Sequence, residues 1–153
     1  MEKENKKVHL IGLISDGGVH SHWKHVAAIA QIAASYFHVS TYIHAITDGR
    51  DTDPKSGIGY LEELSKAIEG TGVQIATVIG RYFAMDRDKR WERVKKAYDL
   101  YVHGIGNSLP DWKTVVQSSY DNQVTDEFIE PCFINGIEGR IENGDVVFCF
   151  NFR

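Results

Sequence analysis

Short apolar runs alternate with helix-like spacings over the first hundred residues. The runs at 8–14, 39–46 and 73–79 are rich in β-branched residues, and each ends at glycine or polar residues, which is typical of buried strands. Between the runs, apolar residues recur at the 3.6-residue spacing of a helix that packs on one side. The inward faces predicted in this way are Val26, Ile29, Ala30 and Ala33; Leu61, Leu64 and Ile68; and Trp91, Val94, Tyr98 and Val102.

Local signals predict where two of these helices begin or end. Asp53 followed by Pro54 predicts the N-cap and first position of the second helix. Gly104 predicts the end of the third. Strands that alternate with helices in this way are joined by right-handed crossovers and lie parallel. We therefore expect an α/β fold of three layers, with helices on both faces of the central sheet.

The last third of the chain is less regular. It predicts a short helix at 112–119, followed by strands at 128–134 and 146–150. Asn135-Gly136 and Asn143-Gly144 are turn signals, and we interpret the residues between them as part of a hairpin. A hairpin would add antiparallel pairing, so we expect the mostly parallel sheet to be mixed.

Composition narrows the possible functions. The chain has 153 residues, of which 42% are apolar, and it has no internal repeat, so we expect a single domain over 1–153. A net charge of −4 argues against nucleic acid as the main partner. No apolar run reaches the roughly 18 residues of a membrane span, and the polar start Met1–Lys7 does not resemble an export signal. We expect a cytoplasmic protein whose cysteines, Cys132 and Cys149, are both buried and reduced.

The unusual residues follow the predicted strands. In open α/β sheets, ligands bind beyond the carboxyl ends of the strands. There the sequence places a His-containing loop, an Arg-Asp pair, two further arginines and a last arginine: His20, Arg50 and Asp51, Arg81 and Arg87, and Arg153. Arginine forks two hydrogen bonds onto a carboxylate or phosphate, so this convergence indicates a small ligand that carries both groups.

Several of these residues also have simpler interpretations. Arg50 and Asp51 could form a turn salt bridge, whereas Asp51 beside a guanidinium could accept a proton from a substrate hydroxyl. Arg90 and Arg93 fit a solvated helix face, although 81–96 holds seven basic and three acidic residues and could attract a small anion. Phosphate loops, dinucleotide fingerprints and nucleophile elbows are absent from the sequence.

Histidines grouped near the first loop raise a metal hypothesis. His20, His22 and His25 could share an ion, which would suit a metal-dependent phosphohydrolase. Their spacing does not match a known ligand motif and no adjacent carboxylate completes a set, so we expect no metal site in this chain. His20 alone could hydrogen-bond a phosphate. We interpret the remaining histidines as structural or surface residues: His9, His38, His44 and His103.

Four long motifs in order resemble the cofactor-independent phosphoglycerate mutases. They are Ser15-Asp16-Gly17-Gly18-Val19-His20-Ser21-His22, Asp48-Gly49-Arg50-Asp51, the segment 80–91 that begins Gly80-Arg81-Tyr82, and Asn151-Phe152-Arg153. In that family a two-domain enzyme interconverts 3-phosphoglycerate and 2-phosphoglycerate through a phosphoserine, with two manganese or magnesium ions in the phosphatase-like domain. This chain resembles the other, substrate-binding domain, and we expect it to be a fragment of such an enzyme.

The resemblance implies roles for the matching residues. It implies that Asp51 and His20 are catalytic, and that the substrate is bound by the same two residues with four arginines: Arg50, Arg81, Arg87 and Arg153. No segment of this chain resembles the one that carries the serine or the metal ligands. We therefore expect no mutase activity from the chain alone, no cofactor in it, and a serine and metal domain as its partner. The alternative is a stand-alone module that binds phosphate or carboxylate without catalysis.

Overall fold

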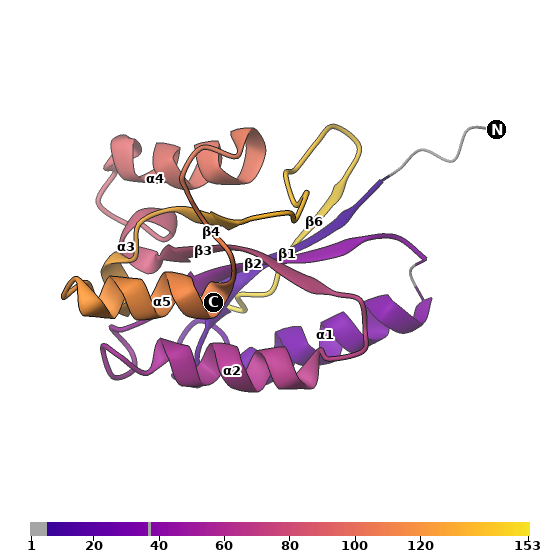
Figure 1. The fold of residues 1–153 in the computed structure, drawn as a ribbon, viewed down its shortest axis with the longest axis horizontal. Helices are drawn as coiled ribbons and strands as arrows, with labels where there is room; N and C mark the ends of the chain where they lie inside the picture. Colours follow the sequence, from indigo (N-terminus) through magenta and orange to yellow (C-terminus); the bar gives the residue numbers. More distant parts are fainter. Residues whose placement is uncertain (1–5, 37) are drawn as a thin grey trace.

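The chain folds into a central sheet with helices on both faces (Figure 1). The computed structural model describes residues 6–36 and 38–153. Its elements are β1 (Val8–Ile14), α1 (Trp23–Tyr36), β2 (Thr41–Thr47), α2 (Gly57–Ala67), β3 (Gln74–Gly80), α3 (Arg81–Ala84), α4 (Trp91–Tyr98), η1 (Asp99–His103), β4 (Asn107–Leu109), α5 (Trp112–Asp121), η2 (Asp126–Phe128), β5 (Cys132–Ile134) and β6 (Val146–Cys149). In Figure 1, α1, α2 and α5 cover one face and α3 and α4 cover the other.

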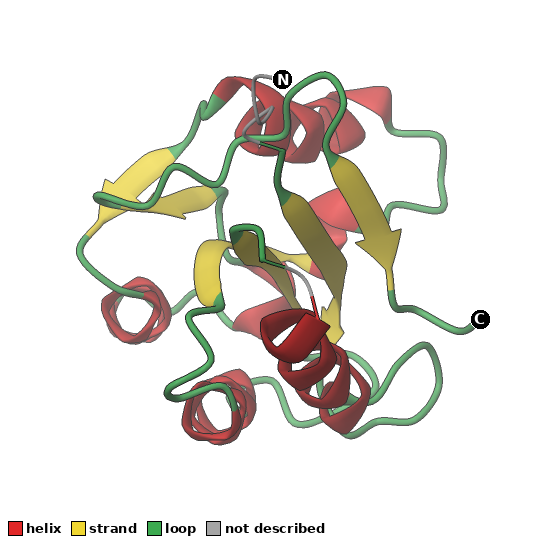
Figure 2. Ribbon diagram, turned by 90° about the vertical axis from the view of Figure 1, so that its right-hand side faces the viewer, coloured by secondary structure: helices red, strands yellow, loops and turns green. Residues whose placement is uncertain are grey.

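The sheet is mostly parallel and mixed, as the sequence predicts. Its six strands lie in the order β4-β5-β3-β2-β1-β6, and only the β3–β5 pair among them is antiparallel. Figure 2 shows the strands between the helices. The pairs β1–β2 and β2–β3 join strands that are consecutive in the chain, through the crossover helices α1 and α2. This arrangement confirms the α/β fold with three layers.

Two apolar clusters fill the space between the sheet and the helices. Because side chains alternate along a strand, Leu10 and Ile14 of β1 face one cluster with Val26 and Leu61, whereas Leu13 faces the other. The first cluster lies under α1, α2 and α5, and the second lies under α3, α4 and η1. Burial on both faces is what parallel strands require, and it agrees with their continuous apolar runs.

The inward face predicted for the third helix is wrong at Trp91, Val94 and Tyr98, which are exposed, and confirmed only at Val102, which packs against the second cluster. Trp91 of α4 is 71% exposed and Tyr98 is 56% exposed. The buried positions are Ala97, Leu100 and Tyr101, which share the second cluster. These residues also follow helical spacing at i, i+3 and i+4, so the segment carries two apolar stripes, and the larger side chains marked the outer one.

The start predicted for the second helix is also wrong. The side chain of Asp53 accepts a hydrogen bond from Lys55 N at 3.0 Å in a turn, and α2 begins only at Gly57. The carboxylate that caps this helix belongs to Asp126, which accepts from Gly57 N at 2.7 Å. A carboxylate satisfies a free N–H of a helix first turn equally well when it comes from a distant segment.

The hairpin predicted between the last two strands does not form. Because β5 lies beside β3 and β6 lies beside β1, the two strands stand on opposite sides of the sheet centre. The strand predicted at 128–134 is confirmed only from Cys132 onward. Cys132 is buried, as expected, but Cys149 is exposed because it lies on the edge strand β6.

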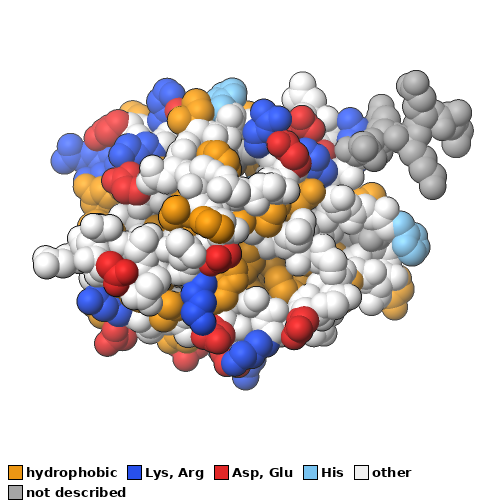
Figure 3. Space-filling model, viewed as in Figure 1, with side chains coloured by type: hydrophobic (Ala, Val, Ile, Leu, Met, Phe, Trp, Pro, Cys, Tyr) orange, Lys and Arg blue, Asp and Glu red, His pale blue; other side chains and the backbone are white. Residues whose placement is uncertain are grey.

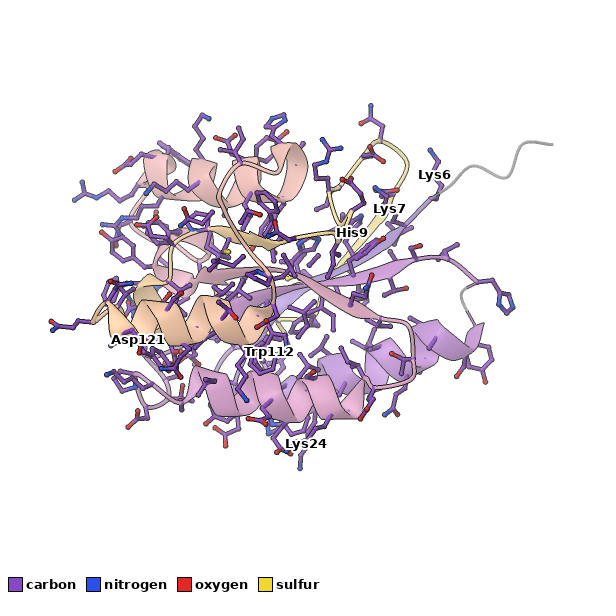
Figure 4. All side chains as sticks on the ribbon, viewed as in Figure 1. Lys6, Lys7, His9, Lys24, Trp112 and Asp121 are labelled. Atoms are coloured by element: carbon purple, nitrogen blue, oxygen red, sulfur yellow. The ribbon has the colours of Figure 1, made fainter. Side chains whose placement is uncertain are left out.

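A chain of buried polar groups crosses the sheet beneath the second cluster. His9 Nε2 lies 3.1 Å from Asp145, His9 Nδ1 lies 2.9 Å from His44 Nε2, and His44 Nδ1 lies 2.9 Å from Thr77 Oγ1. Burial lowers the pKa of His44 to about 3. Figure 4 shows His9 beside the loop that precedes β6. His9 and His44 are therefore structural, and His38 and His103 are exposed, as predicted.

No helix in residues 6–36 and 38–153 has both the length and the apolar character needed to cross a membrane. Most of the polar start Met1–Lys7, on which the expectation of no export signal rests, lies outside the described residues.

Candidate functional site

Three strands end level with one another at the edge where the site lies. In the sheet register, Ile14 of β1 pairs with Thr47 of β2, and Thr47 pairs with Gly80 of β3. The next residue on each strand is therefore brought to the same line across the sheet, and those residues are polar: Ser15, Asp48 and Arg81. Parallel pairing alone produces this convergence of positions far apart in the sequence.

Asp48 is the anchor of the site. It is buried, and it accepts hydrogen bonds from Ser15 Oγ at 2.7 Å, Arg81 Nη1 at 2.7 Å, Asp51 N at 3.0 Å and Arg50 N at 3.2 Å. Burial by itself would raise the pKa of Asp48, but these hydrogen bonds outweigh burial and lower it. A carboxylate with this many donors holds the loop 48–51 in one conformation.

Arg81 joins the loops that follow β1 and β2. Its Nη1 donates to Asp48 and, at 2.8 Å, to Asp51 Oδ2, while its Nη2 lies 3.3 Å from His20 Nε2. His20 Nε2 lies 3.7 Å from the same Asp51 oxygen. Burial would lower the pKa of Arg81, but the two carboxylates outweigh burial and raise it. Asp51, His20 and Arg81 therefore meet at one point, as the sequence predicts, and Asp51 remains partly exposed there.

Arg50 does not pair with its neighbour Asp51. Its side chain is 44% exposed, and it donates to Glu127 Oε1 through Nε at 3.0 Å and also through Nη2. The turn salt bridge considered for Arg50 and Asp51 is therefore wrong, because each residue has a different partner. Gly49, which precedes Arg50, has a φ of +69°, and a Cβ there would lie 2.8 Å from Glu127 N.

A small polar cavity opens beside this cluster. It has a volume of about 50 Å³, which is enough for a small group. Four arginines line it together with Asp86 and Asp88: Arg50 from the loop after β2, Arg81 from α3, Arg87 from the segment that leads into α4, and Arg93 from α4 itself. The space-filling view shows Lys and Arg among Asp and Glu over α4 (Figure 3). The cavity thus brings together three of the four predicted arginines and adds Arg93.

Arg93 corrects the interpretation of this region as a solvated face. Its guanidinium lies 3.8 Å from the centre of the Tyr82 ring and 3.2 Å from Asp86 Oδ1, whose side chain is 1% exposed. A stacked and ion-paired arginine has a defined direction. No spacing in the sequence marks it, because the cavity forms only when α3 folds back against α4. Arg90, by contrast, is exposed.

The fourth predicted arginine lies at the same edge. β6 runs parallel to β1, and Asn151 Oδ1 beyond it accepts from Leu13 N at 3.0 Å. Phe152 N then donates to His20 O at 2.8 Å, so the last residues lie along the loop that carries His20. The side chain of Arg153 is exposed at this edge.

Of the three grouped histidines, His22 and His25 lie with their ring centres 6.0 Å apart, whereas His20 has different neighbours. His20 contacts Asp51 and Arg81, whereas His22 Nδ1 accepts from Lys24 N at 3.2 Å. Across residues 6–36 and 38–153, no group of three or more His, Cys, Asp or Glu is placed to hold a metal ion. The described residues therefore offer no ligand set for the two ions that the resemblance assigns to another domain, and we derive no step through a metal here.

Sequence reasoning missed two carboxylates of the site. Asp48 belongs to the motif 48–51, which assigns it no role, and Glu127 lies in a segment without a motif. Asp48 could have been found from its position directly after a buried strand, as Arg81 was. Glu127 carries no such signal, because it reaches Arg50 from 77 residues away.

A larger cavity lies elsewhere and contains none of these residues. It measures about 320 Å³ and is lined by η1, β5 and the loop 136–140. Its walls hold none of the converging arginines, so size alone does not mark the site in this fold.

Comparison with known proteins agrees with this geometry. Residues 1–153 match the family described as BPG-independent PGAM N-terminus (iPGM_N). The chain belongs to this family. It is 53% identical over 152 residues to the 2,3-bisphosphoglycerate-independent phosphoglycerate mutase of Bacteroides fragilis, and 54% identical over 152 residues to that of Bacteroides thetaiotaomicron. The family resemblance of the four motifs is thereby confirmed.

A solved member of the phosphoglycerate mutases has the same fold. The crystal structure of Leishmania mexicana phosphoglycerate mutase at low cobalt concentration is similar to this chain with a TM-score of 0.88 and 34% identity, over 99% of this chain and 30% of that one. The chain likewise covers 30% of each Bacteroides relative. It spans about a third of the length of the mutases that it matches.

Proposed function

We propose that the chain is the substrate-binding part of a phosphoglycerate mutase, an isomerase of glycolysis that interconverts 3-phosphoglycerate and 2-phosphoglycerate in the cytoplasm. The observation that carries the proposal is the cavity lined by Arg50, Arg81, Arg87 and Arg93, next to the partly exposed carboxylate of Asp51 that Arg81 also binds. Its relatives of 53% and 54% identity carry the mutase name. The reaction requires both features, because the substrate is a dianionic phosphate ester with a carboxylate and a free hydroxyl.

The arginines account for anion binding. A transferred phosphoryl group needs its charge stabilised and its position held, and guanidinium groups supply both. Arg81 is fixed by two carboxylates, so it presents an ordered cation rather than a mobile one. Arg87 and Arg153 are exposed, and they would close on the ligand from the rim of the site.

Asp51 is the candidate base and His20 its neighbour. Phosphoryl transfer between two oxygens of one glycerate leaves each hydroxyl to be deprotonated or protonated in turn. A carboxylate within reach of both hydroxyls can serve each half-reaction. Asp51 Oδ2 is held by Arg81 at 2.8 Å and faces His20 Nε2 at 3.7 Å, so its direction is set before a ligand arrives.

The remaining chemistry belongs to a partner domain in this proposal. A serine there would take and return the phosphoryl group, with two manganese or magnesium ions that hold its charge. No segment of this chain resembles that serine. We therefore expect the chain alone to bind the substrate without turning it over, with a dissociation constant on the order of 1 mM because only half of the site is present.

The test is a titration of isotope-labelled chain with 3-phosphoglycerate, followed by NMR. We expect saturable shifts at His20, Arg50, Asp51, Arg81 and Arg87, and no conversion to 2-phosphoglycerate. Replacing Arg87 with alanine should weaken binding. Arg140→Ala is the matched control, because Arg140 is an exposed arginine that pairs with Glu138 at 3.4 Å, outside the small cavity.

Four results would count against the proposal. Shifts that cluster elsewhere would contradict the location of the site, and conversion by the pure chain would contradict the division of labour. Binding that is no stronger for 3-phosphoglycerate than for inorganic phosphate, with no gain when a serine domain is added, would favour a stand-alone anion-binding module. Metal retained after dialysis at one ion per chain would favour a hydrolase.

A further inference from the structure

We propose that Glu127 is a positioning residue that holds the Arg50 guanidinium ready for an anionic ligand. The inference rests on the proposed function and extends it to a residue outside the four motifs. Glu127 Oε1 accepts from two nitrogens of Arg50, Nε at 3.0 Å and Nη2. Nη1 takes no part in this pair, and Arg50 lines the small cavity with the other arginines. The guanidinium is thus clamped on one side while another side remains for a ligand.

The backbone beneath Glu127 is rigid, as a positioning residue requires. Its N and O lie where only glycine fits on the neighbouring loops: a Cβ on Gly49 would be 2.8 Å from Glu127 N, and a Cβ on Gly80 would be 2.2 Å from Glu127 O. Gly80 N also donates to Ile129 O at 2.8 Å. The segment therefore packs closely against the ends of β2 and β3, the two strands that Arg50 and Arg81 follow in the chain.

The neighbouring Asp126 fastens the same segment from the other side. It is fully buried, its Oδ2 accepts from Gly57 N at 2.7 Å, and its Oδ1 accepts from the Tyr120 hydroxyl. Its backbone O accepts from Thr47 Oγ1 at 2.7 Å. Contacts with α2, α5 and β2 thus fix the backbone that leads into Glu127. The side chain of Glu127 is 15% exposed, and its single ion-pair partner among the described residues is Arg50. Supporting groups of this kind hold binding side chains within narrow limits.

Glu127 has two opposing effects on an anion. Its negative charge repels the ligand, whereas its hold on Arg50 spares the ligand the cost of ordering a long side chain, about 0.5–1.5 kcal/mol. The two effects are separated by two substitutions. Glu127→Gln removes the charge and keeps an oxygen that accepts from Arg50, whereas Glu127→Ala removes both.

The first measurement needs no ligand. In NMR spectra, the Arg50 Nε–H signal should be shifted and protected from solvent exchange in the wild-type chain, retained in Glu127→Gln and lost in Glu127→Ala. Equal signals in all three chains would overturn the inference. Because this readout reports Arg50 alone, it decides the inference even if the wild-type chain fails to bind 3-phosphoglycerate, which would count against the proposed function instead.

The second measurement is the dissociation constant for 3-phosphoglycerate and for inorganic phosphate. We expect Glu127→Gln to bind at least as tightly as wild type, and Glu127→Ala to bind about 2- to 12-fold more weakly than Glu127→Gln. Equal or tighter binding by Glu127→Ala would show that Glu127 only competes for Arg50, and would overturn positioning. Glu130→Ala is the matched control: it removes a carboxylate of the same segment, which pairs with Lys96 at 3.2 Å, and should leave the constant unchanged.

Discussion

Replacing Arg81 with methionine should strongly destabilise the chain. Methionine keeps an unbranched side chain but leaves Asp48, whose side chain is 1% exposed, without its cation. Breaking a buried ion pair by removing one partner costs about 3–5 kcal/mol. Ser15 and two backbone N–H groups still donate to Asp48, so we expect the lower end of this range, about 3 kcal/mol.

Urea unfolding followed by circular dichroism measures this loss. With a slope of about 2 kcal/mol per molar urea, the midpoint should fall by about 1.5 M. Arg140→Met is the matched control, because Arg140 is half exposed and forms one long ion pair with Glu138. A surface change of that kind should alter the unfolding free energy by less than about 0.5 kcal/mol.

Arg81 and Asp48 should also be energetically coupled. Asp48→Asn removes the charge that Arg81 neutralises, so the double variant should be more stable than the sum of the two single losses predicts, by about 1–3 kcal/mol. Hydrogen bonds lower the pKa of Asp48 below its ordinary value of 3.8, so the stability that this contributes is present above about pH 4 and is lost as pH falls. The loss of unfolding free energy caused by Arg81→Met should therefore be larger at pH 7 than at pH 3. A midpoint shift below about 0.5 M, or strict additivity, would refute the argument.

Three further predictions concern stability. Burial raises the pKa of Asp126 to about 6, so its contribution to the unfolding free energy is greatest below pH 4 and is lost as pH rises to 6. Over this range, urea unfolding should show the unfolding free energy of Asp126→Asn rising relative to that of wild type by up to about 3 kcal/mol. Gly59→Ala should raise the unfolding free energy by about 0.5–1 kcal/mol, because Gly59 lies in a helix with open space around it. Gly80→Ala should lower the unfolding free energy by about 1–3 kcal/mol, because its Cβ would lie 2.2 Å from Glu127 O. Thermal unfolding that ranks these two variants the other way would contradict both expectations. His44, with a pKa of about 3, stays neutral in the fold, so wild type should lose stability as pH falls from 6.5 toward 3 and His44→Gln should lose less, as acid titration of the unfolding free energy will test.

Much of the fold follows from local pattern. The three parallel strands and the helices after them are visible in the sequence, because a strand buried on both faces must be apolar throughout and a helix on its surface must be apolar on one side. The convergence of His20, Asp51 and Arg81 was predictable for the same reason. Parallel strands end at one edge, so the residues that follow them meet there.

The errors lie where the sequence left two local solutions. The segment that forms α4 and η1 has an outer stripe with Trp91 and an inner one with Ala97 and Leu100, and only the position of β3 and α3 selects between them. The hairpin predicted between the last two strands is a second error of this kind. Turn signals at Asn135 and Asn143 mark bends, but they do not say that the chain crosses the sheet between them.

The sequence by itself determined the layers of this protein and the edge that carries its charged loops, because periodicity and strand direction are local properties. Only the tertiary structure decided which groups hold those loops. Asp126 caps α2 from 69 residues away, and Glu127 holds Arg50 from 77 residues away. Contacts of this range leave no trace in spacing, because they depend on how packed elements bring two surfaces together rather than on the residues between them.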